Sequence, residues 1–300
     1  MKIIAIGHAS YDITFPIEKY PEENTKTRLK ESCACGGGPA SNAAYLLAKW
    51  KEDVAFAGVA GKDYYGDKIK EEFEEIGVKT TYFEQSKKMA TMLSFVMANI
   101  KNGSRTILTT QGKNKKPLKK VSKEKYDVIL VDGEEPEASM KIMTKNKQAI
   151  KIIDAGSVKE GTKVLCPYVD YVVCSHDFAE GMAGLIYDQK KETLIEMHRR
   201  LTEMYHNTVV ITLEGDGCFT KIGEDYKIIP SIKVKTVDTT GAGDIFHGAF
   251  TYFISHDYSL EQTCYLANIT GALSVEKIGG RFSMPDLKEV LKIGKDHGVI

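Results

Sequence analysis

Apolar segments of strand length alternate with amphipathic segments of helix length along almost the whole chain of 300 residues. Two middle segments, 128–131 and 209–211, are apolar at every position, which indicates strands covered on both faces. This alternation predicts an α/β protein whose mainly parallel central sheet lies between layers of helices. Because no linker or repeat divides the chain, we expect a single domain over residues 1–300. The expected strands are Lys2–Ile6, Val54–Val59, Tyr126–Asp132, Lys151–Asp154, Tyr171–Cys174 and Thr208–Thr212, and the expected helices are Ser41–Trp50, Gly66–Ile76, Pro136–Lys145, Thr193–Tyr205, Gly243–Ser255, Leu260–Glu276 and Pro285–Leu291.

Two segments, Ile13–Cys35 and Met89–Thr109, depart from this alternation of strands and helices. Both alternate apolar and polar residues and carry β-branched and aromatic side chains, as strands with one solvent-exposed face do. We expect these insertions, at about 13–35 and 89–109, to form a small second sheet outside the main one. The alternative is that they extend the edges of the main sheet.

The charge of the chain is balanced, with 41 Lys and Arg residues against 41 Asp and Glu residues. A net charge of zero gives no overall field that would attract nucleic acid or an anionic membrane, so we expect neither as a partner. No apolar run reaches the roughly 18 residues that span a bilayer, and Gly7 and His8 interrupt the short apolar run at the N-terminus, unlike a signal peptide. We expect the six cysteines to be reduced. The sequence thus predicts a soluble cytoplasmic protein.

The most informative motif is Asp238-Thr239-Thr240-Gly241-Ala242-Gly243-Asp244, which directly precedes a helix-like segment. Thr239 or Thr240 can cap the helix, and the glycines let a ligand approach the backbone. The free N–H groups of the first helical turn, together with the helix dipole, suit a phosphate. Asp244 would repel that phosphate, but it makes sense as the acceptor of a proton from an attacking hydroxyl. The motif predicts a general base beside an anion site, as phosphoryl transfer requires; a plain acidic helix start is the alternative.

Two other nucleotide-binding motifs do not fit the chain. The spacing Gly241-x-Gly243-x-x-x-x-Gly248 differs from the G-x-G-x-x-G of dinucleotide-binding proteins, which disfavours an NAD-dependent enzyme. No G-x-x-x-x-G-K-[ST] occurs, and its absence excludes a Walker-type kinase or ATPase.

Four motifs together resemble those of the ribokinase-like (PfkB) carbohydrate kinases. Residues 238–244 resemble the C-terminal signature of that family, and Gly37-Gly38-Pro39-Ala40-Ser41-Asn42-Ala43-Ala44 resembles its N-terminal signature. Gly61-Lys62-Asp63-Tyr64-Tyr65-Gly66 resembles its Gly-x-Asp-x-x-Gly turn. Thr212-Leu213-Glu214-Gly215-Asp216-Gly217 resembles its nucleotide-side strand end, with Glu214 in place of glycine. The resemblance implies a ribokinase-like fold with a small β-sheet lid, and an ATP-dependent kinase that phosphorylates a hydroxyl of a small sugar.

The resemblance also implies roles for individual residues, with Asp244 as the catalytic base. By resemblance, the anion hole for the γ-phosphate consists of Gly241, Ala242 and Gly243, the sugar site of Asp12, Gly38 and Asn42, and the nucleotide site of Thr212, Gly215, Gly217 and Asn268. Without it, Asp12 is a turn residue at a strand end, Asn42 caps a helix and Asn268 packs within one.

One departure from the family pattern concerns Mg²⁺. Many members carry an Asn-x-x-Glu motif that orients the water shell of this ion, and the present chain has Ser175 and Phe178 at those positions. Because Phe178 cannot hold water, Asp177 and Glu180 are the remaining candidates. ATP with Mg²⁺ is still the expected cofactor, since the ion neutralises the phosphates. The resemblance also gives a candidate site for a monovalent cation such as K⁺ at Asp238, Thr240, Gly279 and Ser283.

The identity of the sugar rests on less specific residues. Ribokinase-type members carry a long donor side chain after the second signature glycine, where this chain has Pro39. Arg105 can supply a donor from the lid, and the segments around Arg105 and Ser175 look like those of ketohexokinases and related bacterial kinases. We therefore expect a ketohexose such as fructose or a derivative. The alternatives are a ribokinase, a nucleoside kinase, and, from another class, a non-catalytic sugar-binding regulator.

The lid also suggests an oligomer. A small sheet outside the main one has exposed edges and one apolar face that another surface must cover. We expect a homodimer paired through residues 13–35 and 89–109, with the lid closing over the sugar to exclude water.

Overall fold

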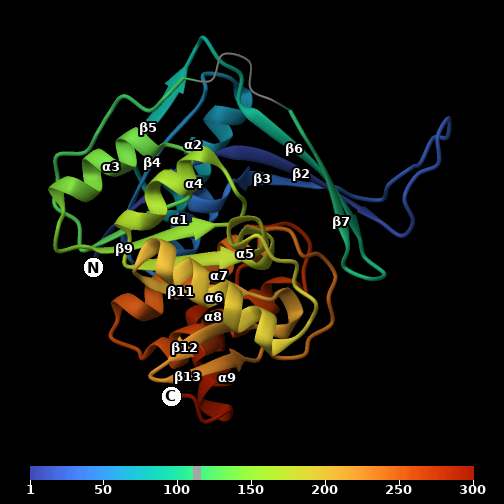
Figure 1. Cartoon of the computed structure of the whole chain (residues 1–300). Helices are drawn as coiled ribbons and strands as arrows, with labels where there is room; N and C mark the ends of the chain where they lie inside the picture. The colour runs from blue at the N-terminus through green and yellow to red at the C-terminus, as the bar shows by residue number, and fades with distance from the viewer. Residues whose placement is uncertain (111–115) are drawn as a thin grey trace.

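A nine-stranded sheet forms the centre of the computed structural model, which describes residues 1–110 and 116–300 (Figure 1). Its strands are β1 (Lys2–Ile6), β4 (Asp53–Gly61), β5 (Lys79–Ser86), β8 (Val128–Val131), β9 (Ile150–Ala155), β10 (Tyr171–Ser175), β11 (Thr208–Thr212), β12 (Cys218–Ile222) and β13 (Asp225–Ile229). They follow the order β13-β12-β11-β10-β9-β8-β1-β4-β5. The pairs of β12 with β11 and with β13 are antiparallel, and the other neighbouring pairs are parallel. The predicted mainly parallel sheet is confirmed.

The middle strands are buried on both faces, as their continuous apolar sequences predict. β1 pairs with β4 on one side and with β8 on the other, and all four residues of β8 are buried. The strands that the sequence did not predict, β5, β12 and β13, lie at or next to the edges of the sheet. There they are partly exposed, so their sequences carry a weaker apolar signal.

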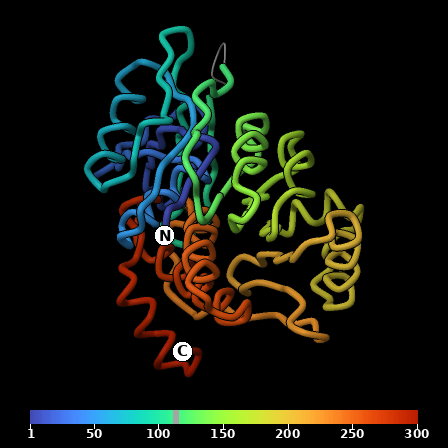
Figure 2. The backbone as a smooth tube through the Cα atoms, turned by 90° about the vertical axis from the view of Figure 1, so that its left-hand side faces the viewer, coloured from blue at the N-terminus to red at the C-terminus, as the bar shows by residue number. Residues whose placement is uncertain are grey.

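Helices pack on both faces of the sheet, and each layer has its own apolar core. One core includes side chains of α1 (Pro39–Lys49), α2 (Tyr64–Ile76), α7 (Ala242–Ser255), α8 (Leu260–Ser274) and α9 (Leu287–Asp296); the other includes those of α3 (Pro136–Lys145), α4 (Glu160–Leu165), α5 (His176–Ala183) and α6 (Lys191–Tyr205). Figure 2 shows the C-terminal helices and the helices of the middle of the chain on different sides. Within the described ranges, no helix is both long and apolar enough to cross a bilayer.

A second sheet, the lid sheet, has the order β3-β2-β6-β7. Its strands are β2 (Ser10–Ile17), β3 (Cys33–Gly37), β6 (Met92–Asn99) and β7 (Arg105–Thr109). The outer pairs are antiparallel, whereas the central strands β2 and β6 are parallel. The sheet extends to one side of the body, and the β2–β3 connection projects furthest (Figure 1). The prediction of a small second sheet is confirmed, with strands that begin at Ser10 and reach Gly37 rather than staying within 13–35.

The turn at Gly61–Gly66 ties the lid sheet to the body. The Asp63 carboxylate caps α2 by accepting a hydrogen bond from the Gly66 N–H at 2.9 Å. The same carboxylate accepts bonds from the backbone N–H and the hydroxyl of Thr91, at 2.8 and 2.7 Å, directly before β6. One carboxylate therefore joins the end of β4, the start of α2 and the start of a lid strand.

Candidate active site

The glycine loop bends back on itself and leads into α7. Asp238 closes the loop, because its carboxylate accepts hydrogen bonds from the Thr240 N–H and the Gly279 N–H, both at 2.9 Å. Gly241 has a φ of 74°, in the left-handed region that glycine tolerates. A Cβ added at Gly243 would meet nothing within 4 Å, so the space in front of the first helical turn is open. An anion can approach the N–H groups of that turn directly.

Asp244 lies in this first turn, and its carboxylate contacts the N-terminal signature at residues 37–44. Asn42, which lies near the start of α1, donates a hydrogen bond from Nδ2 to Oδ2 of Asp244 at 2.8 Å. Burial and the nearby carboxylate of Asp154 raise the pKa of Asp244 to about 7, and the bond from Asn42 opposes the increase. A carboxylate with such a pKa can take up a proton near neutral pH.

Asp12 projects from the lid strand β2 (Ser10–Ile17). The Ser10 hydroxyl donates a hydrogen bond to Oδ1 of Asp12 at 3.0 Å, and burial raises the pKa of this carboxyl. A Cβ at Gly37 would lie 2.1 Å from Oδ2 of Asp12, and one at Gly38 would lie 2.4 Å from the backbone oxygen of His8. The two glycines therefore let the lid strands and α1 approach each other closely.

Arg281 is a site residue that the sequence analysis missed. Arg281 is 4% exposed, and its guanidinium donates hydrogen bonds to Glu72 at 2.7 Å and to the Ser41 hydroxyl at 2.6 Å. Its Nε also donates a weaker bond to Oδ1 of Asn42 at 3.4 Å, which turns Nδ2 of Asn42 toward Asp244. In the sequence, the sole signal for Arg281 is a basic residue directly after two glycines, Gly279 and Gly280, because its partners come from distant parts of the chain.

The turn at residues 212–217, which the sequence analysis assigned to the nucleotide, follows β11. The Leu213 N–H bonds to the Gly217 carbonyl at 2.8 Å, and a Cβ at Gly217 would lie 2.1 Å from the backbone oxygen of Ile229. Glu214 has a φ of 52°, so a side chain occupies a left-handed position where the family pattern has glycine. The Thr212 hydroxyl donates to the carbonyl of Cys174 at 3.3 Å, and a Cβ at Gly215 would meet nothing within 4 Å.

Asn268 is buried, and its amide takes part in packing. Nδ2 donates hydrogen bonds to the carbonyls of Ile229 and Pro230, at 2.8 and 3.3 Å. These contacts join α8 to the end of β13 and agree with the alternative that Asn268 is a helix-packing residue, while its role in the nucleotide site stays a prediction.

Arg105 joins the lid to the glycine loop. Its guanidinium donates a hydrogen bond to the Thr239 hydroxyl, which in turn donates to the Gly103 carbonyl at 3.1 Å. Arg105 pairs with Ala98 of β6, whereas Asp12 pairs with Ser94 of the same strand. Four residues of a strand span roughly 13 Å, so the backbones of Arg105 and Asp12 lie well apart on the lid sheet.

The segment expected to support Mg²⁺ is occupied by other contacts. The Ser175 hydroxyl caps α5 and donates to the Gly156 carbonyl at 3.1 Å, while Phe178 is fully buried. Glu180 accepts a hydrogen bond from the Tyr187 N–H at 2.7 Å, and Asp177 contacts the neighbouring imidazole of His176. The residues at the family positions therefore do not fit the water shell of Mg²⁺. No group of three or more metal-ligating side chains occurs in ranges 1–110 and 116–300.

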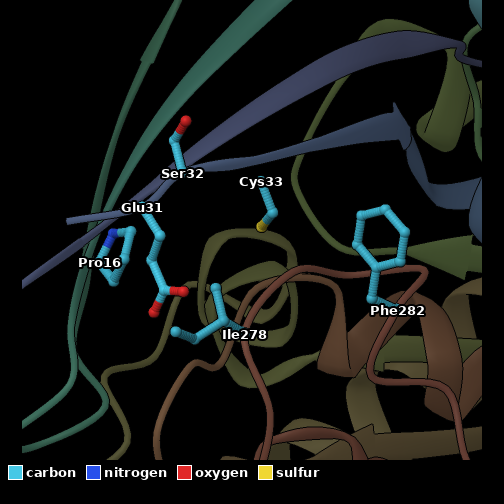
Figure 3. A pocket seen from close by; sticks show the side chains of 6 residues that line it. All are labelled: Pro16, Glu31, Ser32, Cys33, Ile278 and Phe282. Carbon is cyan, nitrogen blue, oxygen red and sulfur yellow. The ribbon is translucent and has the colours of Figure 1, made fainter. Parts of the chain in front are cut away.

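The candidate residues for a monovalent cation lie together, held by their own hydrogen bonds. Asp238 bonds to Thr240 and Gly279, and the Ser283 N–H donates to the Gly279 carbonyl at 3.0 Å. K⁺ at this cluster stays a prediction. Beside Gly279, Ile278 and Phe282 line a pocket of about 330 Å³ with residues of the lid edge (Figure 3). The pocket contains none of the proposed catalytic residues.

Known carbohydrate kinases resemble this chain in sequence and in fold. The family model "pfkB family carbohydrate kinase" matches residues 1–287. A ribokinase from Lactococcus lactis is 25% identical over 300 residues, covering 96% of this chain and 95% of the relative. The structure of Arabidopsis thaliana ribokinase complexed with ribose and ATP has a TM-score of 0.81 at 24% identity, covering 97% of this chain and 98% of that one. Fructokinase from Xylella fastidiosa with bound ATP has a TM-score of 0.76 at 19% identity, covering 99% of each chain.

A parallel sheet with a β lid and a glycine loop that ends in an aspartate defines a phosphotransferase that acts on an alcohol group. More specifically, the chain belongs to the pfkB family of carbohydrate kinases. It is thus an ATP-binding sugar kinase with a ribokinase-like fold.

Proposed function

We propose that the protein transfers the γ-phosphate of ATP to a hydroxyl of a small sugar, with ribose as the first candidate and Asp244 as the base. The observation that carries this proposal is the contact between Asn42 and Asp244, at 2.8 Å, beside the open first turn of α7. It brings together the two signatures on either side of the space where the sugar and the phosphate would meet.

The proposed reaction uses the side chains of the site as follows. Asp12 and Asn42 hydrogen-bond sugar hydroxyls and hold one of them toward Asp244. Above its pKa of about 7, Asp244 accepts the proton of that hydroxyl while the hydroxyl oxygen forms a bond to the γ-phosphorus of ATP. The bond from the γ-phosphorus to the oxygen that bridges to the β-phosphate breaks, and ADP leaves. The N–H groups of residues 241–243 and the α7 dipole stabilise the charge on the transferred group. Mg²⁺ would neutralise the ATP phosphates, but the residues at the family's positions do not fit its water shell.

Ribose is preferred to a ketohexose for two reasons. The ketohexose hypothesis needs Arg105 to replace the donor that Pro39 cannot supply, but the Arg105 guanidinium bonds to Thr239. In addition, curated relatives from Lactococcus lactis, Staphylococcus aureus and Bacillus subtilis are named ribokinases. Both observations support an aldopentose, whose hydroxyls Asp12 and Asn42 can bind without Arg105.

The test is a coupled assay for ADP with ribose, deoxyribose, fructose and adenosine at saturating MgATP, with the product identified by mass spectrometry. We expect ribose to have the highest kcat/KM, and Arg105→Ala to retain the order of substrates. Fructose or adenosine exceeding ribose by about tenfold, a difference of about 1.4 kcal/mol, would overturn the choice of ribose. The absence of any phosphorylated product would overturn the kinase proposal itself.

We also propose that the protein forms a homodimer through the lid sheet. β7 is the last strand of that sheet, all five of its residues are exposed, and Ile107 and Leu108 are 44% and 59% exposed. A free strand edge with apolar side chains favours pairing with another chain. Sedimentation at micromolar concentration should give a dimer in wild type and a monomer in Leu108→Lys. A monomeric wild type, with and without sugar, would contradict the proposal.

A further inference from the structure

A buried acid and a buried imidazole meet directly beneath the first turn of α7. Nδ1 of His247 lies 3.2 Å from Oδ2 of Asp154, and only 4% and 5% of the two side chains are exposed. Asp154 belongs to β9, and His247 follows Asp244 by one helical turn. Burying two ionisable side chains so completely is costly, so their presence at this position needs an explanation. The reaction steps proposed above do not use them.

The hydrogen bonds of His247 require two protons on its ring. Nδ1 lies 2.6 Å from the carbonyl oxygen of Gly243, and Nε2 lies 3.0 Å from the carbonyl oxygen of Val173. A backbone carbonyl only accepts, and a neutral imidazole has a single N–H. A neutral ring would therefore point a lone pair at one of the two carbonyls. The imidazolium satisfies both carbonyls, and the Asp154 carboxylate balances its charge.

A second buried histidine shows the opposite arrangement. Nε2 of His198 lies 3.0 Å from the Val209 carbonyl, but its Nδ1 faces the Thr202 hydroxyl at 3.3 Å, and a hydroxyl can donate. One proton therefore satisfies this ring. Burial lowers the pKa of His198, in agreement with a neutral side chain. Both histidines are buried, with His198 5% and His247 3% exposed, so their hydrogen-bond partners rather than their depth account for the difference.

We propose that Asp154 and His247 form a buried carboxylate–imidazolium pair that positions the first turn of α7 for phosphoryl transfer. Nδ1–H holds the carbonyl of Gly243, which belongs to the anion loop, and Nε2–H holds the carbonyl of Val173 in the sheet. The pair thus attaches the anion loop and Asp244 to the carboxyl ends of β9 and β10. The positioning role in phosphoryl transfer rests on the proposed function, whereas the charge of the pair does not.

Other charged groups face the pair from the elements around it. Asp132 follows β8 and Lys159 precedes α4; the first raises and the second lowers the pKa of Asp154, while His247 also lowers it. Burial has the largest effect and raises the pKa of Asp154, against the lowering by His247 and Lys159. The pair also acts on Asp244, which lies on the same helix as His247: Asp154 raises the pKa of Asp244 and His247 lowers it. The charge of the pair is therefore tied to that of the catalytic carboxylate.

The charge of the pair is tested by NMR on protein with ¹⁵N-labelled histidine. At about pH 8.5, we expect one of the seven rings to be doubly protonated, because each of the two carbonyls that face His247 needs a proton from its ring. Its signals should disappear in His247→Gln and change to those of a neutral ring in Asp154→Asn. His198→Gln, the matched control, should leave them in place. A wild-type spectrum with only neutral rings overturns the ion pair, and this measurement requires neither activity nor a folded variant.

The positioning role is tested by kinetics on the best acceptor. We expect Asp154→Asn and His247→Gln each to lower kcat by about 10- to 100-fold, the loss of a charge-assisted hydrogen bond, with KM for sugar and ATP within about threefold. The double variant should be no slower than the worse single variant, because the side chains act as one unit. His198→Gln should retain wild-type kcat. Folded variants with unchanged kcat, or losses confined to KM, overturn the proposal. An inactive wild type would refute the proposed function and leave the NMR result valid.

Discussion

Replacing Asp244 by asparagine removes the proton acceptor of the proposed reaction and keeps the volume of the side chain. The Nδ2 group of Asn42, now 2.8 Å from Oδ2 of Asp244, finds an acceptor in the new side-chain carbonyl, so the site keeps its geometry. We expect kcat to fall by about 10²–10⁴, which corresponds to about 3–5 kcal/mol of transition-state stabilisation. Binding of ATP should be unchanged or slightly tighter, because a negative charge near the phosphates is removed.

The effects of Asp244→Asn on kcat and on the free energy of unfolding should both depend on pH. Since the pKa of Asp244 is raised to about 7, wild-type kcat should fall as the pH drops through that value. A carboxyl whose pKa is higher in the folded state favours folding at low pH, and this contribution is lost as the pH rises from about 4 to about 7. Asparagine does not titrate. The variant should therefore be more stable than wild type at about pH 8, with a difference that shrinks toward about pH 4.

Steady-state kinetics and urea unfolding over about pH 5–9 measure both effects. The matched control is Glu261→Gln, which neutralises the acidic residue in the first turn of α8 and should leave kcat unchanged. If Asp244→Asn retains more than about a tenth of the wild-type kcat, Asp244 is not the base. If wild-type kcat is the same at about pH 6 and about pH 8, the raised pKa is wrong.

Three further predictions concern stability and are measured by urea unfolding. Phe178→Ala should destabilise the protein by about 3–5 kcal/mol, because it leaves a cavity in a fully buried position; a loss below about 1 kcal/mol would contradict this packing. Arg281→Met should cost about 2–4 kcal/mol by leaving Glu72 without its cation, and adding Glu72→Gln should recover part of the loss; equal stability of single variant and wild type would refute the pairing. Glu214→Gly should raise the free energy of unfolding by about 0.5–1 kcal/mol. A residue with a side chain pays about 1–2 kcal/mol in the left-handed conformation, and glycine avoids this strain but loses more backbone entropy on folding, which offsets about half of the gain. A destabilised variant would show that Glu214 makes a compensating contact.

The central sheet could be predicted because strands buried on both faces must be apolar at successive positions. Segment 128–131 is such a strand, and the structure buries all of its residues. The edge strands were missed because solvent relaxes that requirement: β13 has a single buried residue, Ile229. The lid was predictable for a related reason, since strands with one wet face alternate.

The site was predictable as far as its residues are close in sequence. The glycine loop and the acidic residue after it are local features, and the structure arranges them as a helix start. The expected cap from Thr239 or Thr240 is wrong: Gly241 is the N-cap residue and no side chain caps α7, because the two hydroxyls bond to Gly103 and Asp238 instead. Arg281 was not predictable, because the residues that give it meaning, Ser41 and Glu72, lie more than two hundred positions earlier in the chain. His247 was missed for the same reason, because the groups that contact its ring, the carbonyl of Val173 and the carboxylate of Asp154, are far from it in sequence.

The parallel pairing of the central lid strands has a consequence for how the protein is made. Ser10 lies opposite Met92, and the chain between these residues builds α1, β4, α2 and β5 of the body. The two halves of the lid sheet can meet only after that part of the body has formed, and pairing over such a distance is slow. The proposed site needs Asp12 from the lid sheet and also Asp244, which lies much later in the chain. A chain still emerging from the ribosome therefore has an incomplete site until α7 has been made and has packed on the sheet.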